Sequence, residues 1–206
     1  METNKSTFIQ EARKQQIIDA TIRTLSDIGY VKSSLAQIAK RASISTALIS
    51  YHFADRQDLI EQSLQALIEQ SATYILTKTY AADEPASQLA KFIEASIAYQ
   101  ATHPEENIAL LEIIFNARTA DDIPFYKLPD EGEDPLLKAL SNILTKGKEQ
   151  GEFTITSVHV MVKVIQGAIG EYMLIGGPLS REVEQYSAEV INIIWSAMKV
   201  EETNNA

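Results

Sequence analysis

The chain has 206 residues, of which 45% are hydrophobic and 22% charged, a composition typical of a globular protein with a buried core. It contains no cysteine, which excludes disulfides, zinc ribbons, iron–sulfur clusters and cysteine nucleophiles. No apolar stretch approaches the length of a membrane span and the N-terminus lacks the pattern of a secretory signal, so we expect a cytoplasmic protein.

The net charge of −10 is unevenly distributed along the chain. Residues 1–56 contain eight basic and five acidic residues, whereas residues 57–206 contain ten basic and 23 acidic residues. This asymmetry indicates a mildly basic N-terminal domain over 1–56 and an acidic domain over 57–206. Charge alone leaves chance clustering open as an explanation.

Apolar residues recur at three- and four-residue steps along most of the chain, which predicts an all-α protein. The first helix is expected over 11–28 and is stopped by Gly29. A short helix capped by Ser34, with Gln37 in the spacing of a capping box, ends near residue 41. Further helices are expected over 46–53, from Asp55 onward, and over 87–101, 105–117, 135–149, 157–175 and 180–199, with a long loop over 121–135.

The two short helices, preceded by a longer one, form a helix-turn-helix pattern. The apolar side chains placed to lock them together are Ile38, Ala39, Ile44, Ile49 and Phe53. The outward set on the second short helix, with Ser45 as its N-cap, is then Thr46, Ala47, Leu48, Ser50 and Tyr51. Mostly small or hydroxyl-bearing, this surface can enter a DNA major groove and contact phosphates and thymine methyl groups.

The stretch 33–59 (SSLAQIAKRASISTALISYHFADRQDL) resembles the N-terminal DNA-binding domain of the TetR family of transcriptional repressors. The matching features are a Ser-capped helix, an Ile-Ala pair, a Ser-Ile-Ser turn and the Tyr-His-Phe end of the recognition helix. Three positions depart from the family pattern: Ser43 stands for the turn glycine, Ala47 for the frequent recognition-helix glycine, and Arg56 for the usual lysine. We expect Ser43 to be accommodated, although glycine is the more permissive residue there.

The resemblance implies a three-helix DNA-binding domain over 1–56, followed over 57–206 by a larger helical domain for effector binding and dimerisation. It also implies a homodimer that places two recognition helices in successive major grooves of double-stranded DNA and binds a pseudo-palindromic operator. The DNA-binding residues carried over from the family are Lys32, Ser33, Ser34, Thr46, Ala47, Leu48, Ser50, Tyr51, His52 and Arg56.

The helical pair over 157–175 and 180–199 carries more apolar surface than one subunit needs, so we expect it to form the dimer interface as a four-helix bundle. The alternative is an ordinary pair of helices packed within one chain. The predicted interface residues are Val160, Val164, Gly167, Ile191, Ile194, Trp195 and Met198.

Two carboxylates on apolar helix faces suggest an effector pocket. Glu112 shares a face with Ile108 and Phe115, and Glu171 lies in the apolar run 169–175. A carboxylate there is costly unless it is paired or faces a cavity, so an apolar effector, or a lipophilic cation, is one hypothesis. The alternative is that both carboxylates are paired to Arg or Lys, or lie at a surface edge. The predicted effector-binding residues are Tyr74, Tyr99, Glu112, Phe115, Tyr126, Gln166, Glu171 and Tyr172.

The resemblance implies a two-state switch in which effector binding moves the helix after Asp55 and takes the recognition helices out of register with the grooves. We expect neither a cofactor nor a metal, because the three histidines are scattered, and no enzymatic activity, because no glycine-rich phosphate loop or nucleophile motif is present. An acidic helical protein-interaction module without specific DNA binding remains an alternative. The sequence does not distinguish a repressor from an activator.

Overall fold

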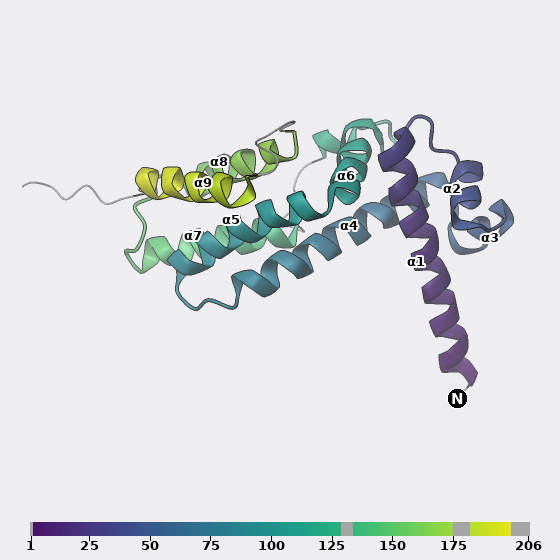
Figure 1. The fold of residues 1–206 in the computed structure, drawn as a ribbon, viewed down its shortest axis with the longest axis horizontal. Coiled ribbons are helices and arrows are strands. Elements are labelled where there is room, and N and C mark those ends of the chain that lie inside the picture. Colours follow the sequence, from purple (N-terminus) through teal and green to yellow (C-terminus); the bar gives the residue numbers. More distant parts are fainter. Residues whose placement is uncertain (1, 129–133, 175–181, 199–206) are drawn as a thin grey trace, which may run out of the picture. The chain divides into compact units, whose positions relative to one another are not determined.

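The computed structural model describes residues 2–128, 134–174 and 182–198 (Figure 1). Over these ranges the chain forms α-helices, one 3-10 turn and no β-strand, which confirms the predicted all-α class. The elements are α1 (Glu2–Ile28), α2 (Leu35–Ala42), α3 (Thr46–His52), α4 (Arg56–Thr79), α5 (Pro85–Thr102), α6 (Pro104–Asn116), η1 (Phe125–Lys127), α7 (Pro135–Glu149), α8 (Val158–Tyr172) and α9 (Val183–Met198). No described helix is long and apolar enough to cross a membrane.

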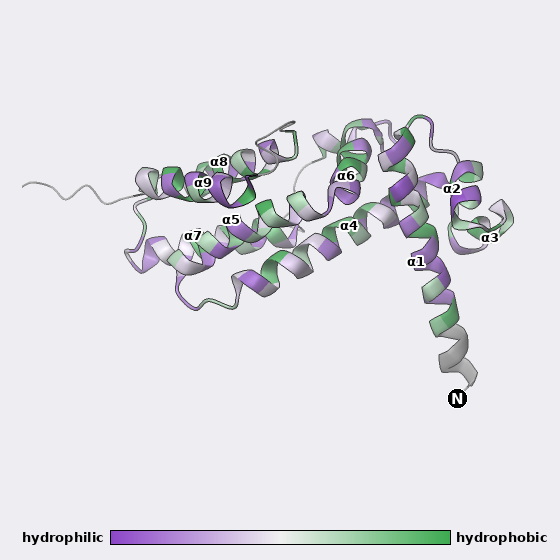
Figure 2. Cartoon of the chain, in the orientation of Figure 1, coloured by the Kyte–Doolittle hydropathy of each residue, from purple (hydrophilic) through white to green (hydrophobic). Residues whose placement is uncertain are grey.

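The chain divides into two compact units, each with its own apolar core. The first comprises residues 1–69 and 104–129, and the second comprises residues 70–103 and 130–206. Most helices carry both apolar and polar positions, as Figure 2 shows, so each helix can bury one face in its unit. The two units are defined by compactness, and the functional boundary at 56/57 stays a prediction.

In the first unit, α1 packs against both α2 and α6, and α3 packs against α2. Ile17 and Leu25 of α1, Ile38 of α2 and Ile113 of α6 are fully buried in this core. Leu59 and Ile60, at the start of α4, join the same cluster. The DNA-binding pattern of the sequence is therefore supported by a core to which α6, remote in the sequence, also contributes.

In the second unit, α5 packs against α7, α8 and α9, and α7 packs against α8. The connection between α7 and α8 is also anchored, because Phe153 is buried against Gly147 of α7. A Cβ atom on Gly147 would come within 2.1 Å of the Phe153 ring, so this close approach requires glycine.

Local capping signals account for the ends of the short helices. The hydroxyl of Ser34 accepts from the backbone N–H of Gln37 at 3.3 Å, and that of Ser45 accepts from Leu48 at 3.2 Å, which confirms both predicted N-caps. Gly29 follows α1 with a φ of 78°, which confirms the expected stop. Helix α1 begins nine residues before the predicted start, because residues 2–10 lack the apolar periodicity on which the prediction relied. The Gly-Gly-Pro joint at 176–178 lies outside the described residues.

Candidate nucleic-acid interface

A buried apolar cluster between α2 and α3, called the lock, orients α3. Ile38, Ile49 and Phe53 are almost completely buried, and the half-buried Ile44 packs against the same cluster. The turn between the helices is closed by the N–H of Ile44, which donates to the carbonyl of Ala39 at 3.0 Å. This arrangement confirms the helix-turn-helix expected from the sequence.

The opposite face of α3 is exposed to solvent. Thr46, Ala47 and Ser50 are exposed, and 70% of the surface of Tyr51 is accessible. Leu48 is half-buried, and the ring of His52 lies edge-on to that of Tyr51 with 5.1 Å between their centres. The structure thus brings the predicted recognition residues together on one short helix.

The turn between α1 and α2, residues 29–34, lies at the predicted phosphate-binding start of α2. Lys32 and Ser34 are exposed there. Ser33 is only 2% exposed, and its hydroxyl donates to the carbonyl of Tyr30 at 2.8 Å. Its side chain therefore stabilises the turn and is not available for the expected DNA contact, because a hydroxyl that pairs within its own turn is drawn inward.

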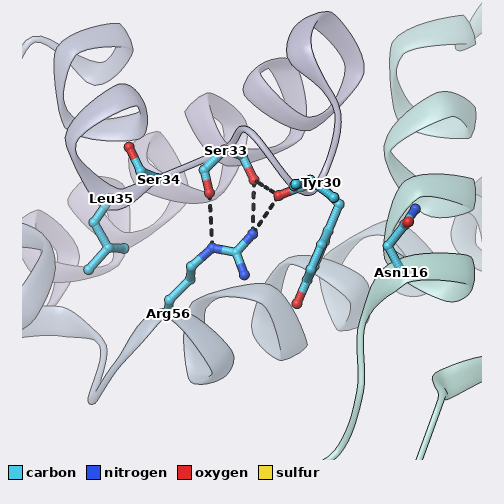
Figure 3. Close-up of a pocket in the computed structure, with 7 residues that line it drawn as sticks. Tyr30, Ser33, Ser34, Leu35, Arg56 and Asn116 are labelled. Carbon is cyan, nitrogen blue, oxygen red and sulfur yellow. Dashed lines mark hydrogen bonds between the residues drawn. The ribbon is translucent and has the colours of Figure 1, made fainter.

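Arg56, the first residue of α4, also holds this turn (Figure 3). Its guanidinium donates from Nε to the Ser33 carbonyl at 3.0 Å, and from Nη2 to the Tyr30 carbonyl at 2.7 Å and to Ser33 Oγ at 3.1 Å. It also lies over the Tyr30 ring, 4.3 Å from the ring centre. The Arg56 side chain, predicted from the sequence to contact DNA, thus makes internal hydrogen bonds that position the start of α2.

An open depression of about 540 Å³ lies beside the turn, with Tyr30 between Arg56 and Asn116 of α6 (Figure 3). Its lining residues are Tyr30, Val31, Ser33, Ser34, Leu35, Arg56 and Asn116. Sequence reasoning missed Tyr30, which has no periodic partner; its only signal is an aromatic residue directly after the glycine that ends α1.

The predicted effector residues of the first unit, Glu112, Phe115 and Tyr126, differ in their contacts and in their exposure. Glu112 of α6 accepts from the backbone N–H of Tyr30 at 2.8 Å and from the side chain of Asn116 at 3.3 Å. Phe115 and Tyr126 are largely exposed, with 6.2 Å between their ring centres. The hydrogen-bond partners of Glu112 are therefore a backbone amide and an asparagine, whereas the sequence-based alternative was pairing with Arg or Lys.

The predicted effector residues of the second unit are mainly part of its core. Tyr99 and Tyr172 are buried, and burial raises the pKa of the Tyr172 phenol. Tyr74 is half-buried, with its ring 5.4 Å from that of Tyr99. Glu171 is exposed at the end of α8, and the half-buried Gln166 accepts from Lys163. Neither Glu112 nor Glu171 is therefore an uncompensated buried carboxylate.

The predicted dimer residues fall into two groups. Val160 and Val164 are 57% and 50% exposed on α8, and Gly167 continues the same exposed face. Ile194 and Met198 of α9 are buried in the core of their own chain, so they are unavailable to a partner. The half-buried pair on α9 is Ile191 and Trp195. Sequence reasoning missed Ile193, which is 68% exposed on α9.

Across the described ranges, no three His, Asp or Glu side chains gather in an arrangement that could hold a metal ion. The chemistry available at the helix-turn-helix is hydrogen bonding, apolar contact and ring stacking, all of which suit recognition of a nucleic-acid groove.

Among known protein families, the model described as "Bacterial regulatory proteins, tetR family" matches residues 17–62 of this chain. Among curated proteins, the HTH-type transcriptional regulator BetI of Escherichia coli is 32% identical over 81 residues, which is 39% of this chain and 42% of the length of BetI. The chain thus matches about two fifths of the length of these curated relatives.

Solved structures extend the similarity of fold to most of the chain. The transcriptional regulator FadR from Bacillus subtilis, in complex with stearoyl-CoA, matches with a TM-score of 0.76 and 21% identity over 90% of this chain and 99% of FadR. The ketosteroid transcriptional regulator KstR2 of Mycobacterium tuberculosis matches with a TM-score of 0.68 and 17% identity over 92% of this chain and 96% of KstR2. At these identities the likeness describes the fold alone.

Proposed function

We propose that this chain, which belongs to the TetR family of bacterial regulatory proteins, is a transcriptional repressor that binds double-stranded DNA as a homodimer and is released by a small apolar effector. The observation that carries the proposal is the exposed face of α3, which includes Tyr51, held by a buried lock on the opposite side. A short, rigidly held helix whose exposed face carries small, hydroxyl-bearing and aromatic side chains can enter a major groove and contact base edges.

The charge distribution supports DNA as the partner of this face. The region that carries α2 and α3 has a basic excess in an otherwise acidic chain, so phosphate attraction is confined to one end of the sequence. Lys32 and Ser34 are exposed at the start of α2, whose N-terminus favours an anion. These groups would contact phosphates while α3 contacts base edges.

The homodimer is proposed from the exposed apolar face of α8 and α9. Val160 and Val164 of α8 and Ile193 of α9 are all at least half exposed, and Gly167 permits close approach of another helix. Two copies of this face related by a twofold axis would bury these residues and place the two α3 helices for a pseudo-palindromic operator, with half-sites about 34–36 Å apart or slightly more.

The effector is proposed to be apolar. Proteins of similar fold include a regulator solved with stearoyl-CoA and one named for ketosteroids. Stearoyl-CoA and ketosteroids both have large apolar portions. A cationic effector loses its support here, because Glu112 accepts from a backbone N–H and Glu171 is exposed to solvent.

Selection of bound duplexes from a random library, followed by titration of the enriched DNA at two salt concentrations, tests the proposal. We expect a pseudo-palindromic sequence bound with strong salt dependence, and Tyr51→Ala should weaken binding by at least about tenfold. Tyr80→Ala removes another exposed tyrosine, from the second unit, and is the control, which should bind like the unaltered protein.

Failure to enrich any sequence would reject the repressor. It would favour the second candidate, an acidic helical protein-interaction module, which accounts for the charge of residues 57–206 without requiring DNA. Binding that Tyr51→Ala leaves unchanged would reject α3 as the recognition element.

A further inference from the structure

We propose that Glu112 of α6 is a positioning residue for DNA binding, acting through its hydrogen bond to the backbone of Tyr30. This inference rests on the proposed function. Glu112 Oε2 accepts from the Tyr30 N–H at 2.8 Å, a contact that joins residues 82 positions apart in the sequence. Glu112 itself does not touch the groups proposed to contact DNA; it fixes the turn that carries them.

The turn is held from two sides by two different helices. Arg56 of α4 binds its carbonyl groups, those of Tyr30 and Ser33, whereas Glu112 of α6 binds the Tyr30 amide. The Tyr30 peptide backbone is therefore fixed through both its donor and its acceptor. Neither anchor lies within the helix-turn-helix, so the position of the turn depends on α4 and α6.

The geometry around Gly29 shows how closely α6 approaches the turn. A Cβ atom on Gly29 would come within 3.4 Å of Glu112 Oε2, and the φ of 78° already favours glycine at this position. Asn116, one helical turn further along α6, donates to the same carboxylate oxygen at 3.3 Å and orients it. The carboxylate is thus seated against the turn and is not a mobile surface group.

The consequence for DNA binding follows from chain continuity. Only Val31, Lys32 and Ser33 separate Tyr30 from Ser34, the N-cap of α2. A shift of the Tyr30 backbone therefore displaces Lys32 and the N-terminus of α2, which are the proposed phosphate contacts. A shift of α6 changes the hydrogen bond to Tyr30, so operator affinity depends on where α6 lies, in addition to the route through α4 that the family resemblance implies.

Whether removal of the Glu112 carboxylate strengthens or weakens DNA binding distinguishes a positioning role from a purely electrostatic one. If Glu112 acted only as a negative charge near DNA, its removal would strengthen binding. If it positions the turn, Glu112→Ala weakens binding by about fivefold to tenfold, because the Tyr30 N–H loses a charged acceptor. Glu112→Gln keeps an acceptor at the same reach and should restore binding to within about twofold, whereas Glu112→Asp keeps the charge but shortens the reach and should behave like alanine.

A double-mutant cycle on the selected operator duplex tests the route through the start of α2. In the Lys32→Ala background one of the two proposed phosphate contacts is already absent, so adding Glu112→Ala should weaken binding by a smaller factor than it does in the unaltered protein. In the Tyr51→Ala background, where the altered contact lies on α3, Glu112→Ala should retain its full effect. The matched control is Glu105→Ala, which removes an exposed carboxylate from the same helix and should not weaken binding. Circular dichroism and thermal melting of every variant report whether the fold is retained.

Each outcome decides the inference. Equal losses from Glu112→Ala in the Lys32→Ala and unaltered backgrounds would overturn it, as would tighter binding by Glu112→Ala or a Glu112→Gln variant as weak as alanine. These results concern only Glu112 and leave the repressor proposal intact. Failure of the unaltered protein to bind any duplex would overturn both.

Discussion

The guanidinium of Arg56 stacks over the ring of Tyr30 at 4.3 Å and donates to the carbonyl of the same residue at 2.7 Å. One side chain at the start of α4 thus binds both the aromatic ring and the backbone of the turn before α2. A lysine, the residue more usual at this position in the family, has a single ammonium and cannot reproduce the planar fork. In this chain, Arg56 therefore makes contacts to Tyr30 that a lysine at this position could not reproduce.

Arg56→Lys should lower the free energy of unfolding by about 1–2 kcal/mol, because the hydrogen bonds to the Tyr30 and Ser33 carbonyls cannot all be kept. Chemical denaturation measures the change. Arg118→Lys, at an exposed arginine with an ion pair to Asp122, is the control and should cost less than about 0.5 kcal/mol. Equal effects of the two substitutions would contradict the assigned role of Arg56.

Ser43→Gly should stabilise the protein by about 0.5–1 kcal/mol. Ser43 is held in the left-handed region, with φ 56° and ψ 42°, where a side chain is strained and glycine is not. The gain is smaller than the full strain because glycine also increases the freedom of the unfolded chain. Guanidinium unfolding measures it, with Ser45→Ala, which removes the N-cap of α3, expected to lose about 1 kcal/mol in the opposite direction. A destabilising Ser43→Gly would show that the serine side chain makes a compensating contribution.

Asp58 should make stability sensitive to acid. Its carboxylate accepts from the side chain of Gln62 at 2.6 Å and from the backbone of Ala54 at 2.8 Å, and these bonds lower its pKa below the ordinary value of 3.8. The ionised carboxylate of Asp58 therefore contributes its full stabilisation above the pKa that it has in the unfolded chain. This contribution is lost as the pH falls through the lower pKa that Asp58 has in the folded protein.

Urea unfolding between pH 7 and pH 3 measures this contribution. Asp58→Asn should lose less stability than the unaltered protein as the pH falls below about 4, because it has no carboxylate to protonate. Asp83→Asn, at an exposed aspartate, should follow the unaltered protein. Identical pH profiles for all three proteins would refute the assignment to Asp58.

Val164→Glu should convert the proposed dimer into a monomer. Val164 is half exposed on α8 beside Val160, and a carboxylate buried at a twofold interface would face its own copy. Sedimentation analysis measures the mass, and operator affinity should fall with dimer loss. Ile123→Glu places the same charge on an exposed apolar residue of the first unit and should leave the mass unchanged. A Val164→Glu protein that remains dimeric would exclude this face.

Local features of the structure were predictable from the sequence because their causes are local. Ser34 and Ser45 cap α2 and α3 through hydrogen bonds to residues three positions ahead, and Gly29 ends α1 through its own backbone conformation. The lock of Ile38, Ile49 and Phe53 likewise follows from side-chain spacing within twenty residues. Helical periodicity also indicated that α3 would expose Tyr51 on the face opposite the lock.

Only the tertiary structure decided which partners the polar groups find. Periodicity places Glu112 on an apolar face of α6, but it cannot state that the Tyr30 N–H, 82 residues away, lies beside it. In the same way, a serine and an arginine near a helix-turn-helix look like DNA contacts until Ser33 and Arg56 are seen to bind each other and the Tyr30 carbonyl. The sequence by itself determined the helices, their caps and the exposed recognition face, because each depends on neighbouring residues; folding determined the two anchors of the turn, because a buried donor or acceptor takes whichever partner the packing brings within reach.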